Sequence, residues 1–519
     1  MELAEVISNN FPTLLRSLET SNVLLGKLRS VVFVKDRIHS VKQQVTMNEK
    51  NDALLSALLE VPQDLEQSVM DGFMAALRSC GQDHVANVFR RESDKFPMSD
   101  EHREMLTKPT VELCKFLDPE NGLLKKLISL GVITWDDNNR IRSKYGFDDK
   151  VEELIDTLLR KSDNSFQALI NSLNETGQSH VAFILTGAGD SRPLSEYYSE
   201  KLREKRANVV PSIIPRCLMS TLISKSVLTP YDQQRVDSKQ TTNEKGEMIL
   251  DLISRKSQAA FDGFMDTLQR CHHEHVVQEL VGPEVAARIE VEVNASKDVI
   301  DVQSLEAEIR EYMQRSLVND GNGAIDETLT SNGISVSRVL DGSIIVKFRC
   351  RDYAALESLQ ELFGSKKLDQ VFTEAFQPKF ADKGLECLRV SIPEEEFQRC
   401  LELKLMTSKH REALLSSAER LADKITVNDE LLDKLSLGKL LREAVKEAVS
   451  EQQVKTLLDI ISRRPDSAFH LLVSALNNTQ QTDAASYLRK LGGDEATQCK
   501  NVLKNEPGKN CYYFRRFLS

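Results

Sequence analysis

The ten-residue stretch LNETGQSHVA, Leu173 to Ala182, recurs along this chain and indicates a repeated fold. The copy LRSCGQDHVA, Leu77 to Ala86, has the same spacing. Two more divergent copies, LQRCHHEHVV and LNNTQQTDAA, begin at Leu268 and Leu476. The four leucines are 96, 95 and 208 residues apart. Internal repetition at such intervals predicts three contiguous folded units, an insertion of about one domain, and a fourth unit.

Each unit has the hydrophobic periodicity of helices. In the second unit, apolar residues recur at three- and four-residue steps, as in Leu123, Leu124 and Leu127. Such spacing gives each helix one buried stripe. Short polar connections between the stripes are typical of compact antiparallel bundles. With 519 residues, the chain is long enough for about four or five domains.

The repeated stretch itself predicts a junction between two helices. Gly81 and Gly177 stand where a helix can end in the left-handed conformation, which glycine adopts at little cost. A new helix then begins, with His84 or His180 in its first turn. We interpret these histidines as structural residues of the junction rather than as metal ligands or pH sensors.

The second unit, with Leu123-Leu124, Val132-Ile133-Thr134 and the Thr176 to Ala182 signature, resembles the caspase recruitment domain (CARD). That family belongs to the six-helix death fold. The resemblance implies a mainly α chain with four such bundles, at residues 1–95, 101–188, 193–285 and 397–492. The fourth is the most divergent, because Gln480 replaces the glycine and Asp483 replaces the histidine.

The insertion, residues 287–393, has a mixed pattern. Alternating apolar residues predict strands around Ile289, from Ile334, from Ile344 to Cys350 and around Leu388, with a hairpin turn at Asp341-Gly342. Helical spacing predicts one helix over 305–317 and another over 353–363. The order β-α-β-β-α-β is that of the ferredoxin-like sandwich, an α+β fold. The stretch from Ser343 to Leu362 also resembles the N-terminal domain of the TNF-receptor-associated death-domain adaptor (TRADD).

The same strand order occurs in RNA-recognition domains, so nucleic-acid binding was weighed. Those domains stack bases on exposed aromatic residues of the central strands. Here Phe348 falls on the apolar phase of its strand, and residues 287–389 hold 18 acidic and 13 basic residues. The whole chain has a net charge of −11, which opposes a general grip on phosphates. These features disfavour nucleic acid as a partner.

Composition also indicates the cellular compartment. The nine cysteines are scattered and form no Cys-x-x-Cys pair, a pattern of reduced, intracellular proteins. The N-terminus lacks the basic-then-apolar order of a signal peptide. No apolar stretch approaches the roughly 20 residues that span a bilayer. We expect a cytoplasmic protein with no membrane association.

Motifs of catalysis are missing from the sequence. It holds no caspase-type cysteine signature, phosphate-binding loop or kinase glycine loop. We expect no enzymatic activity, no catalytic residues, no cofactor and no metal. The run His272-His273-Glu274-His275 lacks a partner group at zinc-ligand spacing and coincides with the helix junction. Met70, Phe166, Phe261 and Phe469, each seven residues before an anchor leucine, are expected in the core.

The resemblance implies pairing with other CARD proteins through charged patches. Complementary charge selects partners and speeds encounter. In the second unit Asp136 and Asp137 should open a helix with exposed carboxylates. The full set of predicted interaction residues is Lys125, Lys126, Asp136, Asp137, Arg140, Arg142, Arg203, Lys205 and Arg206.

These features predict a cytosolic adaptor of the invertebrate multi-CARD type that recruits caspases or other apoptotic and innate-immune proteins, with self-association possible. Tandem modules would add avidity. Two alternatives remain at this point: an architectural array whose bundles mainly contact one another, and a nucleic-acid sensor. The C-terminal tail, residues 493–519, ends in an aromatic and arginine-rich stretch. It predicts a flexible end, a strip that packs on the fourth bundle, or a short recognition peptide.

Overall fold

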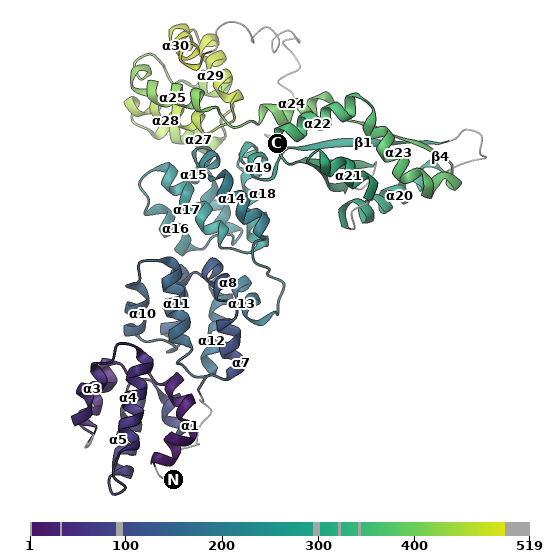
Figure 1. Cartoon of the computed structure of the whole chain (residues 1–519). Coiled ribbons are helices and arrows are strands. Elements are labelled where there is room, and N and C mark those ends of the chain that lie inside the picture. The colour runs from purple at the N-terminus through teal and green to yellow at the C-terminus, as the bar shows by residue number, and fades with distance from the viewer. Residues whose placement is uncertain are drawn as a thin grey trace. The chain divides into compact units, whose positions relative to one another are not determined.

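The computed structural model describes residues 3–31, 34–89, 97–293, 301–319, 323–340 and 344–493 (Figure 1). Contacts divide the chain into two compact units. The first comprises residues 1–196, 223–238 and 251–263, and the second comprises residues 197–222, 239–250 and 264–519. The expected Asp341-Gly342 turn and the tail from residue 494 lie outside the described residues.

In the first helical segment, two of the helices begin at polar caps. The Ser21 hydroxyl accepts from the Leu24 N–H, and Thr46 forms a capping box with Glu49. Leu14, Leu54 and Phe73 are buried between the helices. The helices are α1 (Leu3–Ser17), α2 (Asn22–Leu28), α3 (Ile38–Lys42), α4 (Met47–Leu59), α5 (Glu66–Ser79) and α6 (Asp83–Val88).

The second helical segment has the same order of helices. Its first helix is divided into two parts, Asp100–Thr107 and Thr110–Phe116. Asn121 and Gly122 interrupt the helical backbone before α9, and Gly122 has a φ of +82°. Thr134 caps α10 and exchanges hydrogen bonds with Asp137. The helices are α7 (Asp100–Thr107), α8 (Thr110–Phe116), α9 (Leu124–Ser129), α10 (Trp135–Arg142), α11 (Phe147–Leu158), α12 (Asn164–Glu175) and α13 (Ser179–Thr186).

The third helical segment repeats these local features. Thr229 and Asp232 form the capping box that Thr134 and Asp137 form in the second segment. Its helices are α14 (Glu196–Val209), α15 (Pro215–Ser224), α16 (Pro230–Asp237), α17 (Thr242–Ser254), α18 (Gln258–Arg270) and α19 (Glu274–Val281).

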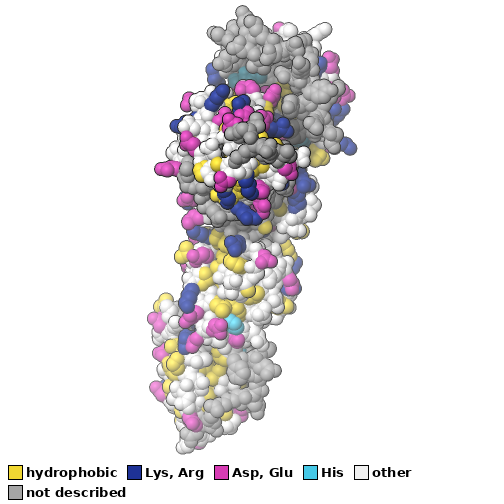
Figure 2. Space-filling view, turned by 90° about the vertical axis from the view of Figure 1, so that its right-hand side faces the viewer, with side chains coloured by type: hydrophobic (Ala, Val, Ile, Leu, Met, Phe, Trp, Pro, Cys, Tyr) yellow, Lys and Arg dark blue, Asp and Glu magenta, His cyan; other side chains and the backbone are white. Residues whose placement is uncertain are grey.

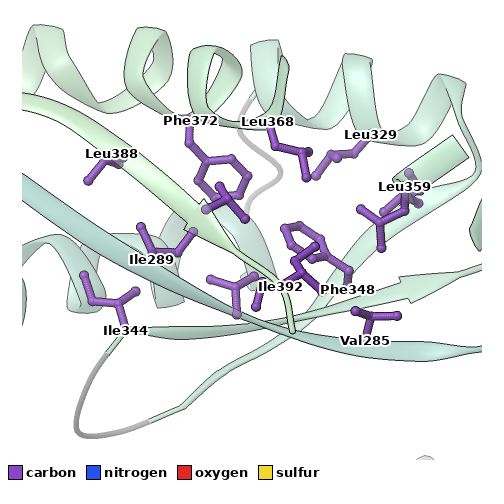
Figure 3. Close-up of a cluster of buried hydrophobic side chains, with 14 of the residues drawn as sticks. Val285, Ile289, Leu329, Ile344, Phe348, Leu359, Leu368, Phe372, Leu388 and Ile392 are labelled. Carbon is purple, nitrogen blue, oxygen red and sulfur yellow. The ribbon is translucent and has the colours of Figure 1, made fainter. Parts of the chain in front are cut away.

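The inserted domain contains one antiparallel four-stranded sheet. Its strands are β1 (Glu284–Val293), β2 (Ile334–Leu340), β3 (Ile345–Cys350) and β4 (Leu385–Ser391), in the order β2-β3-β1-β4. Ala287 of β1 faces Val346 of β3, and Ile289 faces Val390 of β4. Phe348 is fully buried, as its phase in the sequence predicts. Figure 3 shows Phe348 and Ile289 of the sheet facing Phe372 and Leu368, which both lie in the covering helix Lys367–Phe380.

Each connection across this sheet holds more helix than the sequence pattern predicts. The single helices expected over 305–317 and 353–363 are followed by further ones, because apolar residues such as Leu329, Phe372 and Phe376 add a second buried stripe. The helices are α20 (Val302–Met313), α21 (Gly323–Ser331), α22 (Tyr353–Gly364) and α23 (Lys367–Phe380).

The fourth helical segment begins later than its predicted start at residue 397. Phe397 and Cys400 lie in α24 (Glu394–Glu402) and are buried in the core of the sheet domain. The segment's own core includes Leu414, Leu457 and Phe469. Its helices are α25 (Ser408–Leu421), α26 (Asp429–Lys434), α27 (Lys439–Glu447), α28 (Ser450–Ser462), α29 (Ser467–Asn478) and α30 (Thr482–Gly492).

The repeated stretch forms the same helix junction in all four segments. Gly81 and Gly177 have φ values of +74° and +73°, which confirms the left-handed turn. His272 and Gln480 occupy the equivalent positions at φ 59° and 61° without being glycine. The aligned Phe166, Phe261 and Phe469 are buried as predicted, whereas the aligned Met70 is only partly buried.

Candidate interaction sites of the helical segments

The histidine of the repeated stretch contacts the following helical segment. His84 Nε2 lies 2.6 Å from the backbone oxygen of Arg160, and His180 Nε2 lies 2.8 Å from that of Arg255. His275 Nε2 lies 2.9 Å from the oxygen of Arg463. Both members of each pair belong to the same compact unit. We call each such contact region a joint, numbered one to three along the chain.

The joint histidines are neutral donors. A carbonyl oxygen can only accept, so Nε2 must carry the proton. Burial lowers the pKa of His84 and of His180 to about 4, although the hydrogen bond to the carbonyl opposes the shift. Burial also holds the pKa of His275 well below its ordinary value. A structural role for these histidines therefore fits their geometry.

In joints one and two, the residue two positions before the histidine is a glutamine, and its side chain binds backbone atoms of its own segment. Gln82 accepts from the Glu19 N–H at 2.9 Å and donates to the Glu19 oxygen at 2.9 Å. Gln178 makes the same pair of bonds with Asp118, at 2.7 and 3.0 Å. Glu19 and Asp118 are thus equivalent, and each presents a carboxylate to its joint.

Joint one contains a buried ion network. Lys161 Nζ lies 3.1 Å from Glu19 Oε2 and 3.0 Å from Asp137 Oδ2, and all three side chains are at most 10% exposed. Arg140 pairs with Asp137 at 3.0 Å and with Glu153 at 2.6 Å. Burial opposes ionisation of Asp137, but Lys161 and the Thr134 N–H lower its pKa overall. The network joins the first segment to the second.

Joint two repeats this chemistry with substitutions. Lys256 Nζ lies 2.9 Å from Asp232, as Lys161 does from Asp137. Arg235, the equivalent of Arg140, pairs with Asp118 across the joint at 2.5 Å. In addition, the Thr229 hydroxyl donates to Asn121 Oδ1 at 2.6 Å. The carboxylate of the preceding segment therefore pairs with the lysine in joint one and with the arginine in joint two.

Joint three is more apolar. Ile214 occupies the position of Glu19 and Asp118 and is buried with Cys217 in the core of the fourth segment. The buried Arg463 side chain donates to Asn243 Oδ1 at 2.9 Å and to backbone oxygens of the third segment. Arg411 reaches Ser212 Oγ at 3.1 Å, as Arg103 reaches Ser17 in joint one. The joint forms although the sheet domain separates the two segments in sequence.

The structure corrects the prediction that Asp136 and Asp137 are both exposed. Asp136 is exposed, but Asp137 is 2% exposed and belongs to joint one. Arg140 is engaged in the same network. Asp137 is buried because it pairs with Lys161, which also binds Glu19. These two partners lie 24 and 118 residues from Asp137 along the chain. Of the remaining residues predicted in this segment, Lys125 and Arg142 are exposed, and Lys126 pairs with Glu175 at 2.5 Å.

The basic residues predicted on the first helix of the third segment are largely paired. Lys205 lies 3.0 Å from Glu279, and Arg206 donates to the backbone oxygen of Glu247 at 3.3 Å. Arg203 is exposed and pairs with Glu200 at 3.3 Å. On the face drawn in Figure 2, acidic and basic side chains are interspersed rather than grouped by sign. The expected basic counter-surface is therefore reduced to exposed Arg203.

Sequence reasoning missed the lysine and arginine side of the joints. A signal was present, because Arg160-Lys161-Ser162 recurs as Arg255-Lys256-Ser257 95 residues later. From the sequence alone, a repeated basic pair at the end of a helix is interpreted as surface charge. Its role in a joint becomes evident only when its acidic partner in the preceding segment is known. The joint partners of the histidines are backbone atoms, which no side-chain motif marks.

The histidines of the third and fourth segments differ in whether they gather into a possible metal site. The run from His272 to His275 does not gather around one point: His273 accepts from the Ile214 N–H, and His275 donates to Arg463. In the fourth segment, by contrast, His410, Asp466 and His470 place three possible ligand atoms within 4.8 Å of one another. Within the described residues, no helix combines the length and hydrophobicity that crossing a bilayer requires.

Two of the helical segments are similar to a known family. Residues 103–188 and 199–282 match the family described as caspase recruitment domain. These ranges are the second and third helical segments, so two successive segments of the chain are similar to CARDs. No curated protein and no solved structure matches the chain. A CARD is a death-fold module for protein interaction, and such domains typically bind other death-fold proteins.

Proposed function

We propose that the protein is a cytoplasmic adaptor that recruits caspases or other apoptotic and innate-immune signalling proteins by CARD–CARD pairing. The observation that carries the proposal is the match of residues 103–188 and 199–282 to the CARD family. The first and fourth segments share the helix order and the junction of these two. We include them as divergent CARDs, which makes four modules in one chain.

The surface available for a partner is smaller than the charge pattern predicts. Asp137 and Arg140 are occupied in joint one, so a partner of the second segment has to use other residues. Asp136, Arg142 and Lys125 are exposed around α9 and α10, and the adjacent Trp135 is 69% exposed. An exposed aromatic residue among charges is typical of protein-interaction surfaces. We assign partner binding to this group.

Charge reversal of Asp136 tests the assignment. Asp136→Arg in the full chain should weaken capture of CARD proteins roughly tenfold or more, because attraction becomes like-charge repulsion. Glu101→Arg is a matched control, since Glu101 is also an exposed carboxylate in the first turn of a helix. Captured proteins are identified by mass spectrometry. Equal capture by both variants and the unaltered chain would remove Asp136 from the interface.

A second function, an architectural array, is favoured by the joints. The joints use buried ion pairs and backbone hydrogen bonds. The second helical segment makes one joint with each neighbouring segment. In this case the modules serve chiefly to contact one another. An array predicts that the full chain captures no CARD protein even when the exposed residues are unaltered. Recovery of a CARD partner that Asp136→Arg releases would exclude this alternative.

We also propose that the sheet domain is a ferredoxin-like sandwich related to the TRADD N-terminal domain. The strand order β2-β3-β1-β4 with antiparallel neighbours supports the sandwich. A death-adaptor domain beside CARDs fits a signalling scaffold of the invertebrate multi-CARD type. Binding of RNA remains disfavoured in this proposal, because Phe348 is buried and offers no stacking surface.

A further inference from the structure

The fourth helical segment gathers two histidines and a carboxylate at one end of α29. His410 is buried in α25, Asp466 precedes α29, and His470 lies one turn into it. His410 Nδ1 lies 2.8 Å from Asp466 Oδ1, and the rings of His410 and His470 are perpendicular with centroids 5.2 Å apart. One possible ligand atom from each residue lies within 4.8 Å of the other two.

Part of this arrangement is an element of the repeated fold. In the second segment His102 Nδ1 lies 2.7 Å from Asp163 Oδ1, and His102 stacks on Phe166 as His410 stacks on Phe469. The His–Asp pair alone is therefore explained by structure. The residue equivalent to His470 is Gln167, which is bonded to Asn171. The second imidazole is what distinguishes the fourth segment.

The donor set suits a zinc-like cation. Imidazole nitrogens and a carboxylate oxygen bind Zn²⁺ at about 2.0–2.2 Å, and sites with three protein ligands keep one position for water. Bonds of that length in tetrahedral geometry place ligand atoms roughly 3.3 Å apart. The His410–Asp466 pair at 2.8 Å needs only a slight opening. His470 is exposed, and its ring contacts the rings of His410 and Phe469, so it lies beside the inner pair before an ion binds.

Neighbouring groups fix the two inner ligands in place. The Phe469 ring stacks on His410 with centroids 4.1 Å apart and planes within 3°. The Thr407 N–H donates to Asp466 Oδ1 at 2.8 Å, which orients the carboxylate. Partners of this kind orient metal ligands and raise affinity. Two of the three ligands thus have fixed positions before any ion binds.

We propose that His410, Asp466 and His470 form a binding site for one divalent cation of the zinc type, with solvent as the fourth ligand. The ion replaces the proton shared between His410 and Asp466 and ties α25 to the start of α29. The inference does not depend on the proposed adaptor function, since it rests on side chains of the fourth segment alone.

Cobalt titration of the full chain tests the site. Co²⁺ substitutes for Zn²⁺, and its visible absorption reports tetrahedral coordination, while cysteine ligands would add a separate charge-transfer band. We expect one Co²⁺ per chain bound without that band and displaced by Zn²⁺. His470→Gln, which installs the residue found in the second segment, should lower affinity at least tenfold. The exposed position of His470 leaves the fold of this variant intact.

Two further variants complete the design. Gln167→His should add a second Co²⁺ per chain by creating the equivalent site at His102 and Asp163. His39→Gln removes an exposed histidine of α3 and should leave binding unchanged. Thermal unfolding provides a second readout, because an ion that binds only the folded state raises the midpoint. Undiminished Co²⁺ binding by His470→Gln, or no binding by the unaltered chain, would overturn the proposal.

Discussion

The joint histidines are single residues whose protonation is coupled to stability. Above the ordinary histidine pKa of about 6.5, neither the folded nor the unfolded chain carries the extra proton. Between pH 6.5 and about 4 the unfolded chain binds a proton that His84 and His180 do not bind in the fold. The free energy of unfolding therefore falls as the pH falls through this window.

The first prediction concerns this slope. Each joint histidine should cost roughly 1 kcal/mol of stability per pH unit between pH 6.5 and 4. His84→Gln keeps a donor but removes the titrating group, so unfolding midpoints of this variant should depend less on pH. His39→Gln, at an exposed site, serves as the control. Parallel pH profiles for His84→Gln and the unaltered chain would contradict the assignment.

A second prediction at this scale concerns the backbone of His272. Its φ of 59° lies in the left-handed region, where a side chain costs roughly 1–2 kcal/mol. His272→Gly should stabilise the fold by about 1 kcal/mol after the greater freedom of unfolded glycine is deducted. His272→Ala retains the strain and isolates the loss of the imidazole. Chemical denaturation measures both; stabilisation by alanine but not by glycine would refute the backbone explanation.

Individual residues also show what sequence reasoning could and could not predict. The left-handed Gly81 and Gly177 were predictable, because the motif and the chemistry of glycine are both local. The burial of Asp137 was not predictable, because it depends on Lys161 and Glu19 from other parts of the chain. For the same reason the predicted interaction residues include Asp137 and Arg140 of joint one but not their partners Glu19 and Lys161.

At the scale of helices and strands, the connection from α19 to β1 is the tightest point described. Gly282 has a φ of +89°, and a Cβ atom there would lie 1.8 Å from the Cys350 backbone oxygen at the end of β3. The Cys350 N–H also donates to the Pro283 oxygen at 2.8 Å. Only glycine allows the chain to pass so close to β3 as it enters the sheet.

The third prediction follows from this contact. Gly282→Ala should destabilise the sheet domain by about 3 kcal/mol or more, because the backbone of β1 or β3 has to move. Gly364→Ala is the control, since a Cβ atom at that helix end meets nothing within 4 Å. It should change stability by less than about 1 kcal/mol. Similar denaturation midpoints for the two variants would show that the connection is not constrained.

Element order shows the same limit of prediction. The four strands and their phases could be predicted, because alternation is a local pattern and Phe348 falls on its buried side. The pattern predicts one helix in each connection and not the second helices, α21 and α23. Their buried residues, such as Leu329 and Phe372, become recognisable as separate stripes only against the sheet core that they cover. The start of the fourth segment was placed too early because Phe397 and Cys400 look like bundle residues until the sheet core is seen.

At the scale of the whole molecule, the joints determine whether neighbouring modules unfold together. Lys161 is the only side chain in joint one that bridges Glu19 and Asp137 within 3.1 Å among the described residues. Removing one partner of a buried ion network leaves uncompensated charge, which costs about 3–5 kcal/mol. Part of the loss falls on the contact with Glu19 of the first segment, and part falls within the second segment, where Asp137 also loses its partner.

The fourth prediction is therefore that Lys161→Met separates the unfolding of these two segments. Calorimetry of the full chain should show a new transition at lower temperature, with an interaction loss of about 3 kcal/mol. Lys144→Met is the control, because Lys144 pairs with Glu153 at a more exposed position, where such pairs contribute about 1 kcal/mol or less. An unchanged calorimetric profile for Lys161→Met would mean that joint one carries no coupling.

The recurrence of the joint also bears on how such a chain can lengthen. The second segment carries both halves of a joint, with Arg160 and Lys161 for the preceding neighbour and Gln178 and His180 for the following one. Tandem duplication of the roughly 95-residue stretch of gene that encodes it would create a further joint without any new complementary mutation. Growth beyond the fourth segment is different, because Asp483 replaces the histidine and has no proton to donate when ionised. Gain of modules by duplication is thus open for the second segment, whereas a copy of the fourth segment could not form the histidine bond to a following neighbour.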